Sequence, residues 1–301
     1  MNASTWRERL IDPNSPDRRP RRAAYALPTL FTAGNVFLGF YAILQVFQGA
    51  MRMAGKASDA SHYFETAAMA IGVAVFLDGL DGRIARMTNT VSDFGREMDS
   101  LADVITFGIA PAVMAYAWGV LFVEIPLADE LMGRTTLDYL IKAGYLIVFL
   151  YLLCGAMRLA RFNIQKNPIL KNPGRPDRKY FAGLPIPSGA AMIAAVVYAA
   201  RTPLQHWAFS TLWLALVALL SFLMVSTWRY PSFKDMSLMR PRSPLTVVFV
   251  GALIYLVWNF SQAALLSMAV CYVGSGIVIR IGGAIRRKLK QTPPQPEHQV
   301  G

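Results

Sequence analysis

The chain has 301 residues, of which 54% are apolar and only 16% are charged, and its mean hydropathy is +0.37. Soluble domains usually carry about 25% charged residues, so this composition argues against a soluble protein. The formal charge of +12 would suggest nucleic-acid binding in a soluble protein. Here the basic residues lie in short loops between apolar stretches, which favours an anionic membrane surface, and we expect no nucleic-acid partner.

The apolar stretches approach the ~20 residues that a helix needs to cross a bilayer. We expect membrane spans at about 28–49, 62–82, 97–120, 138–160, 183–201, 207–228, 244–260 and 262–281. The expected fold class is therefore an all-α integral membrane protein with about eight transmembrane helices. A basic segment, 1–27, precedes the membrane domain of 28–282, and a tail, 283–301, which is first basic and then Pro-rich, follows it.

The loop charges predict an orientation in the membrane. The N-terminal segment, the second, fourth and sixth loops and the C-terminal tail hold most of the Lys and Arg residues, whereas the odd-numbered loops hold few. This alternation follows the positive-inside rule and places both termini in the cytoplasm, which an odd number of spans would not allow. We expect a multi-pass protein of the inner (cytoplasmic) membrane.

The most informative stretch, 77–108, joins the second and third spans and holds four aspartates. Asp78 and Asp81 are three residues apart, and Asp99 and Asp103 are four apart. On a helix, both spacings put the pair on one face, so two helices joined by a short turn can direct all four carboxylates at one point. Carboxylates in a spanning segment are costly and repel one another unless a cation holds them. Mg²⁺ or Mn²⁺, which prefer oxygen ligands, are the natural partners.

The residues around these aspartates suit a phosphate substrate. Gly82 and Ala85 lack bulk, so a ligand can approach the backbone, and Arg86 can pair with phosphate oxygens. Carboxylates with bound metal, an arginine and small residues are the parts that phosphoryl transfer requires. A purely structural set of helix-end aspartates paired with Arg83, Arg86 and Arg96 is the plain alternative, and the spacing of four aspartates disfavours it.

This stretch resembles the signature of the CDP-alcohol phosphotransferase family, D-x2-D-G-x2-A-R-x8-G-x3-D-x3-D. Every fixed position is matched, by Asp78, Asp81, Gly82, Ala85, Arg86, Gly95, Asp99 and Asp103. Later segments, at 100–112, 157–163, 180–191 and 223–234, look like the membrane-embedded phosphatidylserine synthase branch of that family. The resemblance covers about 28–235. Archaeal enzymes that make a serine ether lipid look similar, so the head group is better indicated than the lipid tail.

The resemblance implies that the phosphatidyl group of CDP-diacylglycerol is transferred to L-serine, with release of CMP. It implies two divalent cations, Mg²⁺ or Mn²⁺, held by Asp78, Asp81, Asp99 and Asp103. Asp103 would also be the general base on the serine hydroxyl. Expected contacts to the CDP moiety come from Asp81, Gly82, Ala85 and Arg86, with Asn35 and Thr29 of the first span as further candidates. The family also implies a homodimer.

The serine carboxylate needs a cation, and the fourth cytoplasmic loop is flanked by several. The candidates for serine binding are Arg158, Arg161 and Lys179, with Asn163 and Tyr180 as additional polar contacts. Ordinary positive-inside charge explains these cations equally well. In the same way, Asn35 fits either a nucleotide contact or a hydrogen bond to a neighbouring helix.

Three alternatives stay open at this point. The aspartate motif does not distinguish serine from glycerol phosphate, inositol phosphate or choline as the acceptor. A cation-coupled transporter could also use four carboxylates, although the cluster lies at one membrane face and the other spans hold few ionisable residues to continue a path. An Asp-rich prenyltransferase would leave the G-x2-A-R element unexplained.

Overall fold

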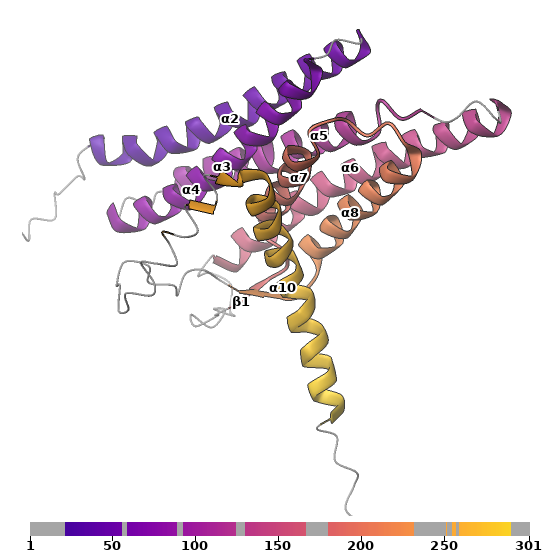
Figure 1. The fold of residues 1–301 in the computed structure, drawn as a ribbon. Helices are drawn as coiled ribbons and strands as arrows, with labels where there is room; N and C mark the ends of the chain where they lie inside the picture. The colour runs from indigo at the N-terminus through magenta and orange to yellow at the C-terminus, as the bar shows by residue number, and fades with distance from the viewer. Residues whose placement is uncertain are drawn as a thin grey trace, which may run out of the picture.

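The computed structural model describes residues 22–55, 59–88, 93–124, 130–166, 180–231, 251, 255–256 and 259–289. Its main elements, in chain order, are α2 (Arg22–Ala54), α3 (Ala60–Thr88), α4 (Asp93–Asp103), the π-helix η1 (Val104–Ile109), α5 (Ala110–Gly119), α6 (Glu130–Lys166), β1 (Tyr180–Ala182), α7 (Ile186–Ala200), α8 (Trp207–Val225), β2 (Arg229–Pro231) and α10 (Ser261–Leu289). Figure 1 shows the helices gathered into one bundle, from which the C-terminal half of α10 extends.

Within the part of the chain that the structure describes, six helical segments are long and apolar enough to cross a membrane: Leu30–Ala54, Ala60–Leu80, Glu97–Gly119, Thr135–Ile164, Trp207–Val225 and Ser261–Gly282. The shorter apolar helix α7 coincides with the expected span 183–201. A helical membrane protein with several spans is therefore confirmed. The expected span 244–260 lies largely outside the described residues, so the total of eight stays a prediction.

The outer faces of the long helices are strongly apolar. Large side chains that are more than half exposed lie on α2, α3 and α8: Phe37, Phe40, Phe47, Phe76, Phe209, Leu212 and Phe222. Soluble monomers rarely expose contiguous apolar patches beyond a few hundred Å². This surface is suited to lipid, which agrees with the composition of the chain.

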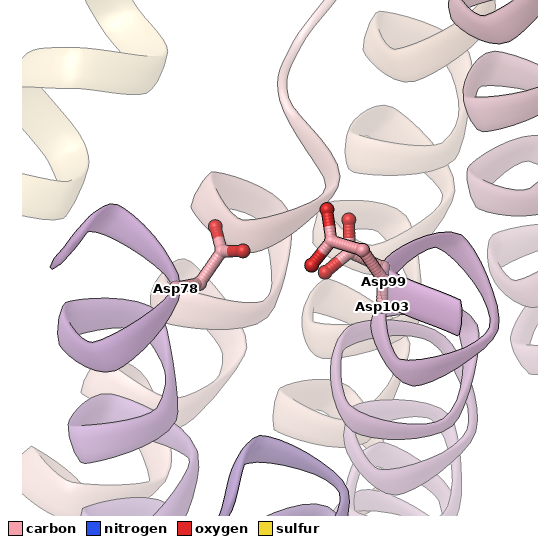
Figure 2. Close-up of side chains that lie close together, drawn as sticks. All are labelled: Asp78, Asp99 and Asp103. Carbon is pink, nitrogen blue, oxygen red and sulfur yellow. The ribbon is translucent and has the colours of Figure 1, made fainter. Parts of the chain in front are cut away.

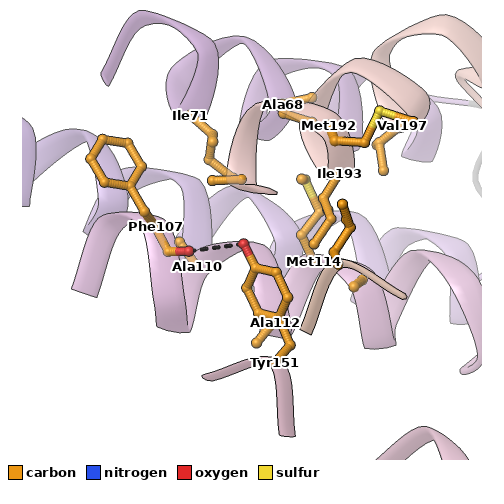
Figure 3. Close-up of a cluster of buried hydrophobic side chains, with 14 of the residues drawn as sticks. Ala68, Ile71, Phe107, Ala110, Ala112, Met114, Tyr151, Met192, Ile193 and Val197 are labelled. Atoms are coloured by element: carbon orange, nitrogen blue, oxygen red, sulfur yellow. Dashed lines mark hydrogen bonds between the residues drawn. The ribbon is translucent and has the colours of Figure 1, made fainter. Parts of the chain in front are cut away.

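The core gathers around α7, a helix rich in alanine. Figure 3 shows Ile193 and Val197 of α7 beside Ile71 of α3 and Met114 of α5, all of them fully buried. Helices in lipid associate through close van der Waals contact, which small residues permit. At the far end of α5, the rings of Trp118 and Trp213 meet edge to face at 5.0 Å, and Gly119 leaves room for the Trp213 ring.

The third expected span, 97–120, is not one regular helix but α4, η1 and α5 in succession. Pro111, in the first turn of α5, has no N–H to donate to the carbonyl of Phe107 four residues earlier. Instead, the Tyr151 hydroxyl of α6 donates to that carbonyl at 3.1 Å (Figure 3). The wider π-helical turn of η1 follows directly after Asp103. The hydrogen bond from Tyr151 therefore ties the segment that follows α4 to the neighbouring helix α6.

Helix α2 packs closely against η1. The Thr106 hydroxyl donates to the backbone carbonyl of Asn35 at 2.9 Å. Gly39 permits this approach, because a Cβ at that position would lie 2.8 Å from the Cα of Thr106. A glycine is therefore required here by contact with a neighbouring backbone.

Two short strands pair with each other, one before α7 and one after α8. β1 and β2 are antiparallel, with Tyr180 opposite Pro231 and Phe181 opposite Tyr230. Gly183 follows β1 with φ of 82°, a conformation that favours glycine. Its N–H donates to the Trp228 carbonyl at 2.8 Å. This pairing joins the start of α7 to the segment after α8.

Candidate active site

Three aspartates from α3 and α4 converge at one point. Asp78 comes from α3, and Asp99 and Asp103 come from one face of α4. One carboxylate oxygen of each lies within 4.8 Å of the others. Figure 2 shows Asp78 facing the other two across the space between the helices. Asp78 and Asp99 are half-buried, and Asp103 is only 8% exposed.

These three side chains fit a divalent cation. Oxygen ligands lie about 2.0–2.6 Å from Mg²⁺ or Ca²⁺, so two oxygens on opposite sides of one ion are about 4–5 Å apart. The observed separation of up to 4.8 Å is within this range. Three oxygen donors, with no His or Cys among them, select hard cations such as Mg²⁺ and Mn²⁺.

The hydrogen bonds around the cluster hold α4 against its neighbours. Asn163 of α6 donates from Nδ2 to the Ser100 hydroxyl at 2.8 Å, one residue away from Asp99. Asn35 of α2 is only 3% exposed, and its Oδ1 is buried without a hydrogen bond to the described part of the chain. A buried polar atom in that state costs roughly 1–3 kcal/mol, so the Asn35 oxygen is ready for a donor from a ligand.

The two arginines of α6 have different surroundings. Arg161 donates from Nη1 to the Val225 carbonyl at 3.1 Å, at the end of α8. Arg158 is half-buried and interacts electrostatically with Asp103, Arg161 and Tyr272. The Nε of Arg158 is buried and donates no hydrogen bond to the described residues. Arg161 thus joins two helices, whereas the charge of Arg158 interacts with Asp103, one of the three aspartates.

Several residues singled out from the sequence have side chains outside the described part of the structure. They are Asp81, Gly82, Ala85 and Arg86 in the last turns of α3, Thr29 in the first turns of α2, and Tyr180 at the start of β1. Lys179 lies outside the described residues altogether. Their functional roles therefore stay predictions, as do those of the three converging aspartates.

No pattern in the sequence indicates a role for four polar residues that hydrogen-bond between helices in the structure. Thr106 and Tyr151 hydrogen-bond to carbonyls of Asn35 and Phe107, respectively. Tyr272 and Ser188 share a side-chain hydrogen bond between α10 and α7. A single tyrosine or serine within an apolar helix gives no pattern by itself, and only the partner across the bundle identifies it.

Comparison with known proteins gives a consistent result. A family model described as CDP-alcohol phosphatidyltransferase matches residues 25–223, about two thirds of the chain. The chain is 36% identical over 216 residues to a CDP-diacylglycerol–serine O-phosphatidyltransferase of Helicobacter pylori, which covers 71% of this chain and 76% of that protein.

Two further relatives come from other organisms. A Bacillus subtilis protein of the same name is 30% identical over 209 residues, which cover 69% of this chain and 91% of the relative. The archaetidylserine synthase of Methanothermobacter thermautotrophicus is 33% identical over 213 residues, 70% of this chain and 72% of the relative.

Proposed function

Because the chain belongs to the CDP-alcohol phosphatidyltransferase family, we propose that it transfers the phosphatidyl group of CDP-diacylglycerol to L-serine, forming phosphatidylserine and CMP. The observation that carries the chemistry is the convergence of Asp78, Asp99 and Asp103 at one end of two membrane helices. The acceptor is supported by the names of the relatives, all three of which specify a serine lipid.

Asp78, Asp99 and Asp103, together with Asp81, would hold two divalent cations, Mg²⁺ or Mn²⁺. When bound by these carboxylates, the cations would supply positive charge to the pyrophosphate and to the departing CMP. Without a cation, the carboxylates repel one another and would also repel the anionic substrate. The site therefore favours cations over the anionic substrate alone.

Asp103 is the general base of the proposed reaction. It accepts the proton of the serine hydroxyl, and the hydroxyl oxygen forms a bond to the β-phosphorus of CDP-diacylglycerol. The bond from this phosphorus to the oxygen of the α-phosphate breaks, and CMP leaves with that oxygen. Asp103 is the least exposed of the three described carboxylates, which suits a base that must be shielded from water.

The CDP moiety would lie against the end of α3 and the inner face of α2. Gly82 and Ala85 give access to the backbone, Asp81 completes the metal ligands, and Arg86 pairs with phosphate oxygens. On α2, Thr29 and Asn35 would contact the nucleotide. Asn35 is the better supported of these two, because an amino group of the base could donate to its buried Oδ1.

Arg158 is the best-supported cation for the serine carboxylate. Arg161 and Asn163 already make hydrogen bonds to the Val225 carbonyl and the Ser100 hydroxyl, so we assign them to the walls of the acceptor site. Lys179 and Tyr180 would complete the site from the segment that leads into β1.

We further propose eight spans with both termini in the cytoplasm, an active site at the cytoplasmic face of the inner membrane, and a homodimer. The alternating basic loops support the orientation. The aspartates support the side, because they lie next to the basic loop between the second and third spans.

The test is release of CMP from CDP-diacylglycerol by purified protein in detergent, with Mg²⁺ or Mn²⁺ and with or without serine. Release is expected only with metal and serine, and Asp103→Asn should abolish it. Asp59→Asn, a matched change outside the site, should have no effect. If release needs glycerol phosphate, inositol phosphate or choline instead, the chemistry stands and the head group is wrong. If no alcohol supports release and no labelled CMP exchanges into lipid, the enzyme assignment fails and a cation-coupled transporter becomes the better hypothesis.

A further inference from the structure

Tyr272 of α10, which the proposed mechanism does not use, joins a polar contact between three helices. Its side chain is half-buried, shares a hydrogen bond with Ser188 of α7, and interacts electrostatically with Arg158 of α6. Arg158 in turn interacts with Asp103. Polar groups therefore continue from the proposed base to α10, which lies beyond the 25–223 segment matched by the family model.

Tyr230 of β2 fixes this part of α10. Its side chain is fully buried, its hydroxyl donates to the Val273 carbonyl at 3.4 Å, and its ring lies 5.9 Å from that of Tyr272. Gly276 leaves space for the Tyr230 ring, with which a Cβ would collide. Burial raises the pKa of Tyr230 to about 12, so the hydroxyl keeps its proton and remains a donor at neutral pH. Tyr272 is thus held at a defined place rather than on a loose terminal helix.

Arg158 lacks a hydrogen bond that its position calls for. An arginine within a spanning segment is costly unless an anion or a set of acceptors compensates it. The Nε of Arg158 is buried and donates no hydrogen bond to the part of the chain that the structure describes. A small anionic group between Arg158 and Tyr272 would receive charge-assisted hydrogen bonds from both side chains.

We propose that Tyr272 and Arg158 together bind the carboxylate of the amino-acid acceptor, and that Ser188 orients the Tyr272 hydroxyl for this contact. This inference rests on the proposed function and deepens it. In serine, only two carbon–carbon bonds separate the carbon that bears the hydroxyl from the carboxylate carbon. An acceptor whose hydroxyl is at Asp103 therefore has its carboxylate close by, toward Arg158. Tyr272 is then a specificity-determining residue that favours acceptors with a carboxylate beside the hydroxyl.

The chain offers a matched control for this contact. Tyr198 of α7 and Ser261 of α10 form a second Tyr–Ser hydrogen bond, 3.0 Å long, between the same two helices. Ser261 precedes Tyr272 by 11 residues, which is about 16 Å along a helix. Tyr198→Phe therefore removes an equivalent interhelical hydrogen bond without touching Arg158.

The experiment measures CMP release by the full-length enzyme as serine is varied at saturating CDP-diacylglycerol. Tyr272→Phe is expected to raise the KM for serine about tenfold or more, because a hydrogen bond to a charged group is lost, while kcat changes by less than about twofold. Ser188→Ala should raise this KM by a smaller factor, and Tyr198→Phe should match the wild type. The preference for serine over serinamide, in which a neutral amide replaces the carboxylate, should fall in Tyr272→Phe and persist in Tyr198→Phe.

The proposal is overturned if Tyr272→Phe keeps the wild-type KM for serine, or if Tyr198→Phe raises it equally. Should Tyr272→Phe fail to elute as a folded protein, Ser188→Ala decides, and a wild-type KM in that variant overturns the proposal. A wild type that releases CMP with another alcohol but not with serine refutes the proposed acceptor itself, and with it this inference.

Discussion

The end of the bundle that carries Asp78, Asp99 and Asp103 differs from the end that carries Arg52 and Asp59 in how its charges are placed. Arg52 and Asp59 form a salt bridge of 3.1 Å, but their side chains are 53% and 48% exposed. Water screens such a pair, which contributes about 0–1 kcal/mol to stability. The three aspartates are instead half-buried or buried and point at one another.

Both ends contain aspartate and arginine, so residue type alone does not distinguish a site from a solvated helix end. What distinguishes them is convergence of like charges together with burial, an arrangement that is unfavourable without a ligand. An unfavourable arrangement held by several hydrogen bonds is typical of a functional site. The predictions below test whether the two ends differ as this comparison requires.

The largest effect is expected for Asp78→Asn. Loss of one metal-binding carboxylate should lower the rate of CMP release about a thousandfold, which corresponds to roughly 4 kcal/mol of transition-state stabilisation. The matched Asp59→Asn at the other end should stay within about twofold of the wild type. Equal losses in both variants would contradict the comparison.

Metal removal should act at the end of the bundle that carries the three aspartates. Chelation by EDTA is expected to abolish CMP release and to lower the midpoint of thermal unfolding, because a cation bound to the folded state stabilises it by mass action. Added Mg²⁺ or Mn²⁺ should reverse both changes. In Asp78→Asn the unfolding midpoint should no longer respond to the metal, and an unchanged response would remove Asp78 from the ligand set.

Tyr151→Phe should cost about 2 kcal/mol of stability and also lower kcat. It leaves the buried Phe107 carbonyl without the donor that replaces the missing N–H of Pro111, in the turn that follows Asp103. Thermal unfolding in detergent and steady-state kinetics measure the two effects. Tyr139→Phe on the same helix, where the side chain is 67% exposed, is the control and should be neutral.

Gly39→Ala should destabilise the protein by about 1–2 kcal/mol, since the new Cβ would lie 2.8 Å from the Cα of Thr106 and would push α2 away from η1. Gly34→Ala, in the same helix, meets nothing within 4 Å and should be neutral or slightly stabilising. A comparison of the two unfolding midpoints tests whether close approach, rather than helix propensity, requires Gly39.

The smallest effect is expected for Arg52→Ala. The exposed salt bridge with Asp59 should contribute less than about 1 kcal/mol, and salt should remove most of that. The measurement is the difference in unfolding midpoint between wild type and variant at low and high NaCl. A loss of stability as large as that of Tyr151→Phe would show that the Arg52–Asp59 salt bridge contributes more to stability than its exposure predicts.

Much of the candidate site could be predicted from local spacing. The family indicated by the aspartate motif is confirmed, and Asp78, Asp99 and Asp103 come together because intervals of four residues and a short turn between helices fix where their side chains lie. The expected span 97–120 was right in extent but contains a π-helical segment, which the sequence signals only through Pro111.

By itself, the sequence determined the membrane class, most of the spanning segments and the aspartate cluster, because hydropathy and helical period act over short distances along the chain. Only the tertiary structure decided which polar residues support that cluster. Tyr151 meets Phe107 across 44 residues, Asn163 meets Ser100 across 63, and Thr106 meets Asn35 across 71. It also showed that Arg158 and Arg161 have different partners, since Arg161 donates to the Val225 carbonyl and Arg158 interacts with Tyr272. Such contacts depend on how whole helices pack, and no local pattern of residues encodes them.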